Sequence, residues 1–343
     1  MTGRRARACP VPSTRAPPIV SATLMPPRAS PPLRDAVVIC TRNRPAELAR
    51  TLQSVARQSG AHHRRVVVVD GSDHDDAERT AAVVRRWNDA PVPFHHHRYS
   101  GPPAGTRQRN AGVDLLPDSV DVVHFLDDDM TLQAGYFEAL CAALVEHPSL
   151  LGVGGIILDS TEDSPRPSVS WAHRMFLLRT DRPSRVLPSG QTTIAWPLPG
   201  RPLQPAEWLA TGASSYRASV FTAHRFDPAV AGPSPRLEDL DFSFRVAQDG
   251  PLAVVSRARC VHRGASRNAR GMPATARERV VRRYWFIRKN MDSPRNRLAY
   301  WWSLVGQVVA LAFSSHPGST EALRGLLRGL CTVLRRDHPL LRS

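Results

Sequence analysis

Lysine is almost absent from this chain, because Lys289 is the only one among 46 basic residues. No glycine-rich loop with a lysine follows the first apolar segment, where the chain reads Thr41-Arg42-Asn43-Arg44 instead. In many nucleotide-binding proteins such a loop cradles phosphates, and its lysine reaches the outer ones. The sequence therefore argues against this class of phosphate site.

Cysteine is scarce as well, and its spacing excludes the common metal motifs. The five cysteines are an odd number and include no CxxC pair, the spacing that is typical of structural zinc sites. Most of them lie in apolar runs, where a thiol behaves as a small hydrophobic side chain. The lack of a disulfide pattern predicts a reducing, cytoplasmic location.

Acidic residues are missing from residues 1–34, which contain six arginines and many prolines. The prolines interrupt the apolar run that a signal peptide needs, so we expect a disordered basic tail. Residues 265–343 hold 15 basic and 4 acidic residues, which leaves the centre of the chain close to neutral. Nucleic-acid binding needs a basic groove across the folded body, so we expect no nucleic acid partner. Basic ends fit an anionic membrane surface better.

Long apolar runs are also missing, with one borderline exception. Residues 298–315 carry no formal charge and approach the minimum length for crossing a bilayer, but Ser303, Gln307 and Ser314 weaken that interpretation. Leucines then recur on one helical face, at Leu323, Leu326, Leu327, Leu330 and Leu334. This pattern is typical of a basic helix at a membrane surface or of a helix packed on the domain. We expect residues 291–343 to form a basic amphipathic helical extension.

Strand-like and helix-like segments alternate from residue 36 onward. The strand-like segments are 36–40, 66–69, 94–98 and 120–126. Three helices lie between them: the first begins at Pro45, the second begins at Ala77, and the third ends at Leu116. Such repeats predict an α/β fold with a doubly wound, mostly parallel sheet flanked by helices. In sheets of this kind, ligands bind beyond the carboxyl ends of the strands.

Polar clusters follow three of these strands, namely Thr41-Arg42, Asp70 and Asp127-Asp128-Asp129. Three adjacent carboxylates repel one another, and a divalent cation carrying a diphosphate would relieve that repulsion. The alternative is a turn whose aspartates cap a helix starting near Gln133. Because the carboxyl ends of parallel strands meet at one edge of a sheet, we expect the clusters to converge, which favours the metal site.

Five motifs follow one another in a characteristic order. They are Val38-Ile39-Cys40-Thr41-Arg42-Asn43-Arg44, Val69-Asp70-Gly71-Ser72, Gly105-Thr106-Arg107-Gln108-Arg109-Asn110-Ala111-Gly112, Phe125-Leu126-Asp127-Asp128-Asp129 and Leu237-Glu238-Asp239-Leu240-Asp241. The set resembles the family 2 glycosyltransferases over residues 36–290. The resemblance implies a GT-A domain at residues 35–290. It also implies an inverting enzyme that moves a sugar from a nucleotide-diphosphate sugar to an acceptor hydroxyl.

The resemblance assigns several residues to the nucleotide-sugar donor, namely Thr41, Arg42, Asp70, Arg109, Asn110, Asp127 and Gly212. It implies that Asp70 accepts a hydrogen bond from the nucleotide base and that Asp127 contacts ribose or sugar. Gly212 belongs to a turn of small residues that lets sugar and backbone approach closely. From the residues alone, Asp70 also fits a simple Asp-Gly turn, and Arg109 fits a charge on a helix surface.

A divalent metal cofactor, Mn²⁺ or Mg²⁺, is implied in the same way, with Asp129 and His262 as its ligands. Asp128 is the variable middle position of the family's Asp-X-Asp motif, so we expect no role for it. A lone histidine is more often structural, which leaves His262 open. The tracts His62-His63 and His95-His96-His97 are not expected to bind metal, because adjacent residues on a strand point to opposite faces.

The pair Glu238-Asp239 begins a predicted amphipathic helix and resembles the family's Glu-Asp pair. The resemblance implies that Asp239 is the general base that accepts the proton of the acceptor hydroxyl, with Glu238 as a supporting or acceptor-binding residue. Alternatively, acids in this place only favour the positive end of the helix dipole.

The sequence leaves three classes of acceptor: a saccharide, a lipid carrier or a small molecule. Residues 159–205, rich in Pro, Ser and Arg, predict a long lid or binding loop. A lipid-linked acceptor would suit a peripheral position at the inner face of a membrane. Two rival functions are a nucleotidyltransferase with a similar nucleotide-binding half and a noncatalytic sugar-binding relative.

Overall fold

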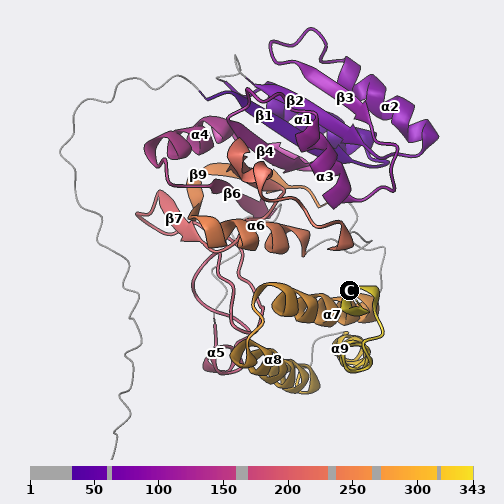
Figure 1. Cartoon of the computed structure of the whole chain (residues 1–343), viewed down its shortest axis with the longest axis vertical. Helices are drawn as coiled ribbons and strands as arrows, with labels where there is room; N and C mark the ends of the chain where they lie inside the picture. Colours follow the sequence, from indigo (N-terminus) through magenta and orange to yellow (C-terminus); the bar gives the residue numbers. More distant parts are fainter. Residues whose placement is uncertain are drawn as a thin grey trace, which may run out of the picture. The chain divides into compact units, whose positions relative to one another are not determined.

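Apolar strands pair into one mixed β-sheet with helices on both of its faces (Figure 1). The computed structural model describes residues 33–59, 64–159, 169–230, 237–264, 272–314 and 318–342. All of them belong to the unit Pro32–Ser343. Nearly all of the expected disordered tail at residues 1–34, and the whole His62-His63 pair, lie outside the described residues.

The strand order in the sheet is β3-β2-β1-β4-β8-β6-β9-β5, and β7 pairs with β9. The strands are β1 (Asp35–Thr41), β2 (Arg65–Asp70), β3 (Phe94–Arg98), β4 (Val122–Asp127), β5 (Met130–Leu132), β6 (Gly152–Asp159), β7 (Leu203–Ala206), β8 (Ala213–Arg217) and β9 (Leu252–His262). Strands β1, β2, β3, β4, β6 and β9 run in one direction, and β5, β7 and β8 run in the other. The predicted α/β class with a mostly parallel sheet is confirmed.

Helices connect the strands and then continue beyond the sheet. They are α1 (Pro45–Ala56), α2 (His74–Arg85), α3 (Gly105–Asp114), α4 (Tyr136–Glu146), α5 (Trp171–Met175), α6 (Glu238–Asp249), α7 (Met272–Asn290), α8 (Pro294–Ala312), α9 (Ser319–Arg335) and α10 (Pro339–Arg342). Two short 3-10 helices, η2 (Ala218–Thr222) and η3 (Pro228–Val230), lie between β8 and α6. The boundary predicted at residue 290 stays a prediction.

The alternation of side chains along each strand builds a separate core on each face of the sheet. Val37 and Ile39 of β1 pack with α1, α2 and α4. Val38, between them, points to the opposite face, where α3 and α6 pack. A Cβ on Gly112 of α3 would lie 2.4 Å from a methyl carbon of Val38, so glycine allows this helix to approach the sheet closely.

The acidic triplet does not cap a helix. Asp127 ends β4, the chain continues as β5 from Met130, and α4 starts only at Tyr136 after Gly135. Met130 and Leu132 are buried in the core and pair with β9, which keeps this segment extended. The capping alternative, with a helix near Gln133, is therefore wrong.

The C-terminal helices pack on one another, and Figure 1 shows α8 and α9 beside α7. A Cβ on Gly329 of α9 would lie 2.8 Å from the Cβ of Val280 on α7, so the two helices are close there. Of the expected leucine face, Leu326 is buried, whereas Leu327 and Leu334 are exposed. The packing alternative thus applies to one side of α9. In the part of the chain that the structure describes, no helix has the length and apolarity needed to cross a membrane.

A buried histidine ties β1, β4 and β8 together. The Nε2 atom of His124 lies 3.1 Å from the Asp35 carboxylate, and its Nδ1 lies 2.6 Å from the Ser215 hydroxyl. Arg64 donates to the same Asp35 carboxylate across 2.8 Å. Burial lowers the pKa of His124, although Asp35 favours the charged imidazolium. The neutral ring is therefore the form that the folded protein holds.

We expect the stability of the protein to fall as His124 becomes protonated. Because its folded pKa lies below the unfolded value of about 6.5, its contribution is complete above that value and is lost as the pH falls below it. Urea unfolding at about pH 7.5 and about pH 5.5 measures the loss. It should be smaller in His124→Gln, which keeps a donor for Asp35 but does not titrate; equal losses in the two proteins would contradict the assignment.

Candidate functional site

Three strand ends that are distant in sequence meet at one edge of the sheet. In the parallel pairing of β1 with β2, Thr41 lies opposite Asp70, and in the pairing of β1 with β4, Cys40 lies opposite Asp127. The loops after β1 and β2 are also joined directly, because Asn43 and Asp73 exchange hydrogen bonds of 2.7 and 2.8 Å. The predicted convergence of the polar clusters is present in the structure.

Asp127 is the accessible carboxylate of the triplet, with 41% of its side chain exposed. One of its oxygens lies 3.1 Å from a guanidinium nitrogen of the buried Arg109. On another side it contacts the backbone of Gly212, where an added Cβ would lie 2.5 Å from the carboxylate. Arg109 and Gly212, both predicted to bind the donor, therefore surround Asp127.

Asp128 is buried and fully engaged, unlike the idle residue expected at the middle position. It accepts hydrogen bonds of 2.7 Å from the Thr41 hydroxyl and of 2.7 Å from Arg44. Burial raises the pKa of Asp128 to about 7, while Arg44 and Thr41 act in the opposite direction. Asp128 thus connects the end of β1 to the acidic loop, which corrects the expectation that it has no role.

Asp129 lies between two nitrogen-bearing side chains, 3.0 Å from His262 and 2.8 Å from Arg44. Burial favours the protonated acid, but hydrogen bonds from His262 and Arg44 outweigh it and hold the pKa of Asp129 well below its usual range. The pairing of β5 with β9 sets Met130 opposite His262, which explains how a histidine far along the chain reaches this loop. The structure therefore brings the two predicted metal ligands together.

The donor atoms of Asp127, Asp129 and His262 all lie within 4.8 Å of one another. The two carboxylates fit Mn²⁺ or Mg²⁺, since such ions take carboxylate oxygens and leave positions for phosphate, and the imidazole nitrogen adds a third donor atom. A second group, Asp35, His124 and Cys141, has similar spacing. It does not suit a cation that also binds phosphate, because His124 and Asp35 are only 1% and 4% exposed and leave no access for a phosphate oxygen.

Glu238 and Asp239 open α6 beside the same arginine. Arg109 reaches Glu238 across 3.4 Å with one nitrogen, while its other terminal nitrogen faces Asp127. Burial raises the pKa of Asp239, partly opposed by the positive charge of Arg109. Burial and the neighbouring charge of Asp239 raise the pKa of Glu238 in the same way. Two carboxyl groups that hold protons more tightly than usual thus lie next to the Asp127 carboxylate.

Asp70 lies at its predicted strand end, but its side chain is fully buried. One oxygen accepts from the Ser72 backbone at 2.8 Å, and the other lies 3.0 Å from His96 Nε2 and 3.6 Å from Arg98. Both oxygens are thus hydrogen-bonded within the protein. A direct contact between Asp70 and a nucleotide base requires this loop to rearrange.

Two other residues that were predicted to bind the nucleotide-sugar donor have their contacts outside the acidic triplet. Arg42 is half-exposed and lies 3.5 Å from Asp73. Asn110 exchanges hydrogen bonds of 2.8 and 3.0 Å with the backbone of Phe226, which fastens α3 to the segment before η3. The Asn110 amide therefore holds α3 against the segment at Phe226 and does not reach the acidic cluster.

Three important residues were missed from the sequence. Arg44 pairs with Asp128 and Asp129, Gln108 donates to the Thr41 and Val69 carbonyls at 3.0 and 2.9 Å, and His96 contacts Asp70. Arg44 and Gln108 belong to the five motifs, so their position could have predicted a role at the site. His96 belongs to a histidine tract, in which only the alternation of side chains along a strand distinguishes one residue from the next.

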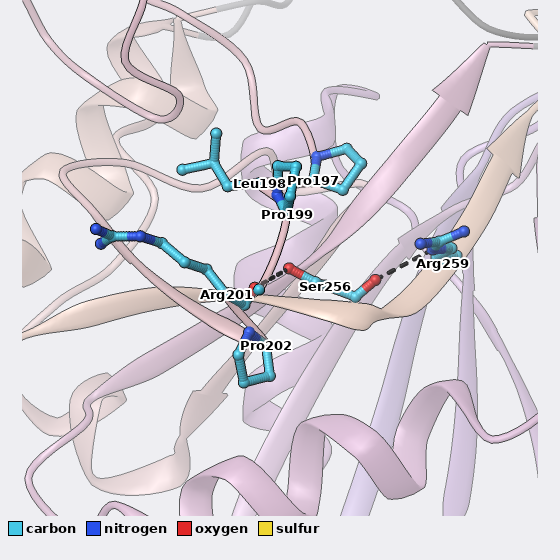
Figure 2. A pocket seen from close by; sticks show the side chains of 8 residues that line it. Pro197, Leu198, Pro199, Arg201, Pro202, Ser256 and Arg259 are labelled. Atoms are coloured by element: carbon cyan, nitrogen blue, oxygen red, sulfur yellow. Dashed lines mark hydrogen bonds between the residues drawn. The ribbon is translucent and has the colours of Figure 1, made fainter.

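An open pocket lies away from these residues (Figure 2). It is lined by the segment Pro197–Pro202 and by Ser256 and Arg259 of β9, and has a volume of about 520 Å³. Figure 2 shows the Ser256 hydroxyl donating to the Arg201 carbonyl, and Arg259 donating to the Ser256 carbonyl. The pocket has no carboxylate in its lining, so it does not share the chemistry of the acidic site.

Comparison with known proteins finds a family match over nearly half of the chain, the part that holds β1 to β6. Residues 36–196 match the family model described as Glycosyl transferase family 2. The chain also resembles crystal structures of S. aureus TarS. A structure of TarS residues 1–349 matches with 14% identity and a TM-score of 0.53, covering 87% of this chain and 81% of that one.

Two further TarS structures match the chain at similarly low identity. A complex of TarS 1–349 with UDP-GlcNAc matches with 16% identity and a TM-score of 0.50, over 83% of this chain and 75% of that one. Against a longer TarS structure, with 15% identity and a TM-score of 0.51, the match covers 82% of this chain but only 44% of the other. At these identities the likeness shows the fold alone. No curated protein matches the chain.

We expect different losses from Asp128→Ala and Asp129→Ala. The first leaves the Thr41 hydroxyl without its buried acceptor and removes one of the two carboxylate partners of Arg44, which should lower the free energy of unfolding by about 1–3 kcal/mol. The second removes a proposed metal ligand, which should abolish the rise in melting temperature caused by Mn²⁺. Asp128→Ala should retain that rise. Unchanged stability in Asp128→Ala, or a normal Mn²⁺ response in Asp129→Ala, would contradict the two roles.

We expect Gly212→Ala to weaken donor binding without unfolding the protein. The new methyl group would lie 2.5 Å from an Asp127 oxygen, so the partly exposed carboxylate must move. Titration of a nucleotide diphosphate should show about tenfold weaker affinity, equivalent to about 1.4 kcal/mol. The unfolding free energy serves as the control. Wild-type affinity in the variant would show that Asp127 does not contact the donor.

Proposed function

We propose that this chain, whose residues 36–196 match the family 2 glycosyltransferase model, transfers a sugar from a nucleotide-diphosphate sugar to an acceptor hydroxyl with inversion. The observation that carries the proposal is the meeting of Asp127, Asp129 and His262 at one edge of the sheet, next to Asp239. Asp127, Asp129 and His262 suit a metal ion and a diphosphate. Asp239 suits a base for the acceptor hydroxyl.

The donor would lie along the ends of β1, β2 and β4. Asp129 and His262 would hold Mn²⁺ or Mg²⁺, with Asp127 directed at ribose or sugar. When bound, such an ion neutralises charge that builds on the departing nucleotide diphosphate. Arg109 holds Asp127 in place, and Thr41, through Asp128, ties the nucleotide-binding loop to the acidic one.

Asp239 is the proposed general base. Its raised pKa suits the task, because proton transfer is most efficient when the pKa of the base lies near the working pH. In the reaction, the acceptor hydroxyl gives its proton to Asp239 while its oxygen bonds to the anomeric carbon. The bond from that carbon to the diphosphate breaks on the opposite side. Glu238 shares Arg109 with Asp127 and so supports the base from the neighbouring position.

A uridine diphosphate sugar is the first donor to test, because a TarS structure of similar fold holds UDP-GlcNAc. We place the reaction in the cytoplasm, at the inner face of the membrane, with a saccharide, lipid-linked or small-molecule hydroxyl as acceptor. Cys40, Cys141, Cys260 and Cys331 are free thiols, which fits a reducing compartment.

The nucleotidyltransferase alternative has no structural support. Lys289, the only lysine of the chain, lies on α7 within 2.9 Å of Asp241 and also pairs with Asp227. It is therefore not placed in a loop after the first strand, where a lysine would bind the nucleotide phosphates.

The donor and metal requirements can be measured together by thermal unfolding. We expect a nucleotide diphosphate to stabilise the protein only when Mn²⁺ or Mg²⁺ is present. A ligand at 100 times its dissociation constant adds about 2.7 kcal/mol. UDP should act more strongly than the other diphosphates if the donor is a uridine sugar. Stabilisation by none of the diphosphates, with or without metal, would refute the proposed donor site.

Replacing Asp239 with Asn should separate binding from catalysis. The amide keeps the shape of the side chain but cannot accept the proton, so transfer should fall by about 10²-fold or more. Metal-dependent binding of UDP should remain. Asp249→Asn, at the other end of the same helix, is the matched control and should transfer normally. Transfer by Asp239→Asn at near wild-type rate would assign the base to another residue.

A further inference from the structure

The outer face of α8 exposes a continuous row of large apolar side chains. Leu298, Trp302, Val305 and Val309 recur at helical spacing, and Phe313 continues the row directly after the last residue of the helix; Leu298 and Phe313 are 71% and 87% exposed. Exposed hydrophobic residues usually occur singly, whereas contiguous ones mark an interaction surface. The row runs the length of the helix.

Helix α5 extends this row sideways. Trp171 and Met175 on α5 are exposed, at 72% and 41%. The two helices are in direct contact, because the Trp302 indole donates to the Met175 carbonyl across 2.8 Å and its ring lies 4.9 Å from that of Phe176. Gly306 allows the approach, since a Cβ there would lie 2.3 Å from Phe176. We call these seven exposed side chains the α5/α8 face.

The opposite side of α8 is buried, which fixes the direction of the α5/α8 face. Ala299, Tyr300, Ser303 and Leu304 are buried, and the Tyr300 hydroxyl donates to the Val280 carbonyl of α7 across 3.0 Å. A helix held in this way exposes only its other side to the surroundings. It can lie in the plane of a surface with its apolar side inserted, as interfacial helices do.

The charges on α8 and on the neighbouring α9 are mostly positive. Residues 294–336 contain six arginines and a single acid, Glu321. Arg295 on α8 and Arg324, Arg328 and Arg335 on α9 are exposed, and α8 itself contains no acidic residue. Arginines beside an apolar strip are complementary to anionic lipid headgroups above acyl chains. A second copy of the chain would instead bring like charges together.

We propose that the α5/α8 face binds the surface of a membrane that contains anionic lipids. The protein lies on the membrane through Trp171, Met175 and the apolar row of α8, with the arginines at headgroup level. The inference rests on the proposed glycosyl transfer and narrows its acceptor to a hydroxyl carried at a lipid surface. It also moves the contact from the leucines of α9, expected from the sequence, to α8, because the α9 stripe partly packs on α7.

Co-sedimentation with vesicles tests the proposal. The full chain should sediment with phosphatidylglycerol-containing vesicles at low salt and should not sediment with pure phosphatidylcholine. Leu298→Glu with Phe313→Glu places two acids on the α5/α8 face at highly exposed positions, so the fold should persist. Its vesicle-bound fraction should fall roughly tenfold. The matched control is Leu115→Glu with Val145→Glu, two exposed apolar residues near the ends of α3 and α4, which should bind normally.

Three outcomes would overturn the proposal: no binding of the wild-type chain to anionic vesicles, full binding by the Leu298/Phe313 variant, and equal loss in the control. Light scattering gives a further test, since a dimer that the variant converts to a monomer would assign the face to a second copy. UDP-dependent stabilisation should be the same in the variant as in the wild type. If vesicle binding is present but no diphosphate stabilises either protein, the proposed function fails and the membrane face stands.

Discussion

The acidic site depends on one buried arginine. Arg109 lies between Asp127 at the end of β4 and Glu238 at the start of α6, at 3.1 and 3.4 Å. Without this cation, those carboxylates and Asp239 would repel one another in surroundings where charge is weakly screened. Burial lowers the pKa of Arg109, but the neighbouring carboxylates outweigh it and raise the pKa well above its usual range, so the guanidinium stays charged. The arginine thereby holds the proposed donor side and the proposed base side of the site at a constant spacing.

Arg44 plays a similar part for the other two aspartates, and His262 is a further partner of one of them. Arg44 donates to both Asp128 and Asp129, and His262 contacts Asp129 from β9. These contacts explain how three consecutive carboxylates coexist next to the core. They also give the aspartates different roles. Both oxygens of Asp128 accept hydrogen bonds within the protein, whereas the Asp127 side chain remains accessible. A metal that joins Asp129 and His262 would take over part of the role that Arg44 has in the structure.

Much of the site could be predicted from the order of the motifs, because parallel strands must bring their carboxyl ends to one edge. The details could not. Asn110 and Asp70 look like site residues in the sequence, yet their polar atoms are largely occupied by Phe226 and by Ser72 and His96. Asp128 looks idle in the sequence, yet it accepts hydrogen bonds from Thr41 and Arg44. A motif shows which residue stands near a site. It does not show which hydrogen bonds saturate that residue.

The sequence by itself determined the α/β alternation, the strand ends that carry the acids and the likeness to a glycosyltransferase family, since these follow from local periodicity and motif order. Tertiary packing decided the rest. It set His262 beside Asp129 through the pairing of β5 with β9, and it turned α8 so that one side packs on α7 while the α5/α8 face stays exposed. Helical periodicity gives the angle between side chains but not the direction of the neighbouring core, so only the folded chain separates a buried stripe from a binding surface.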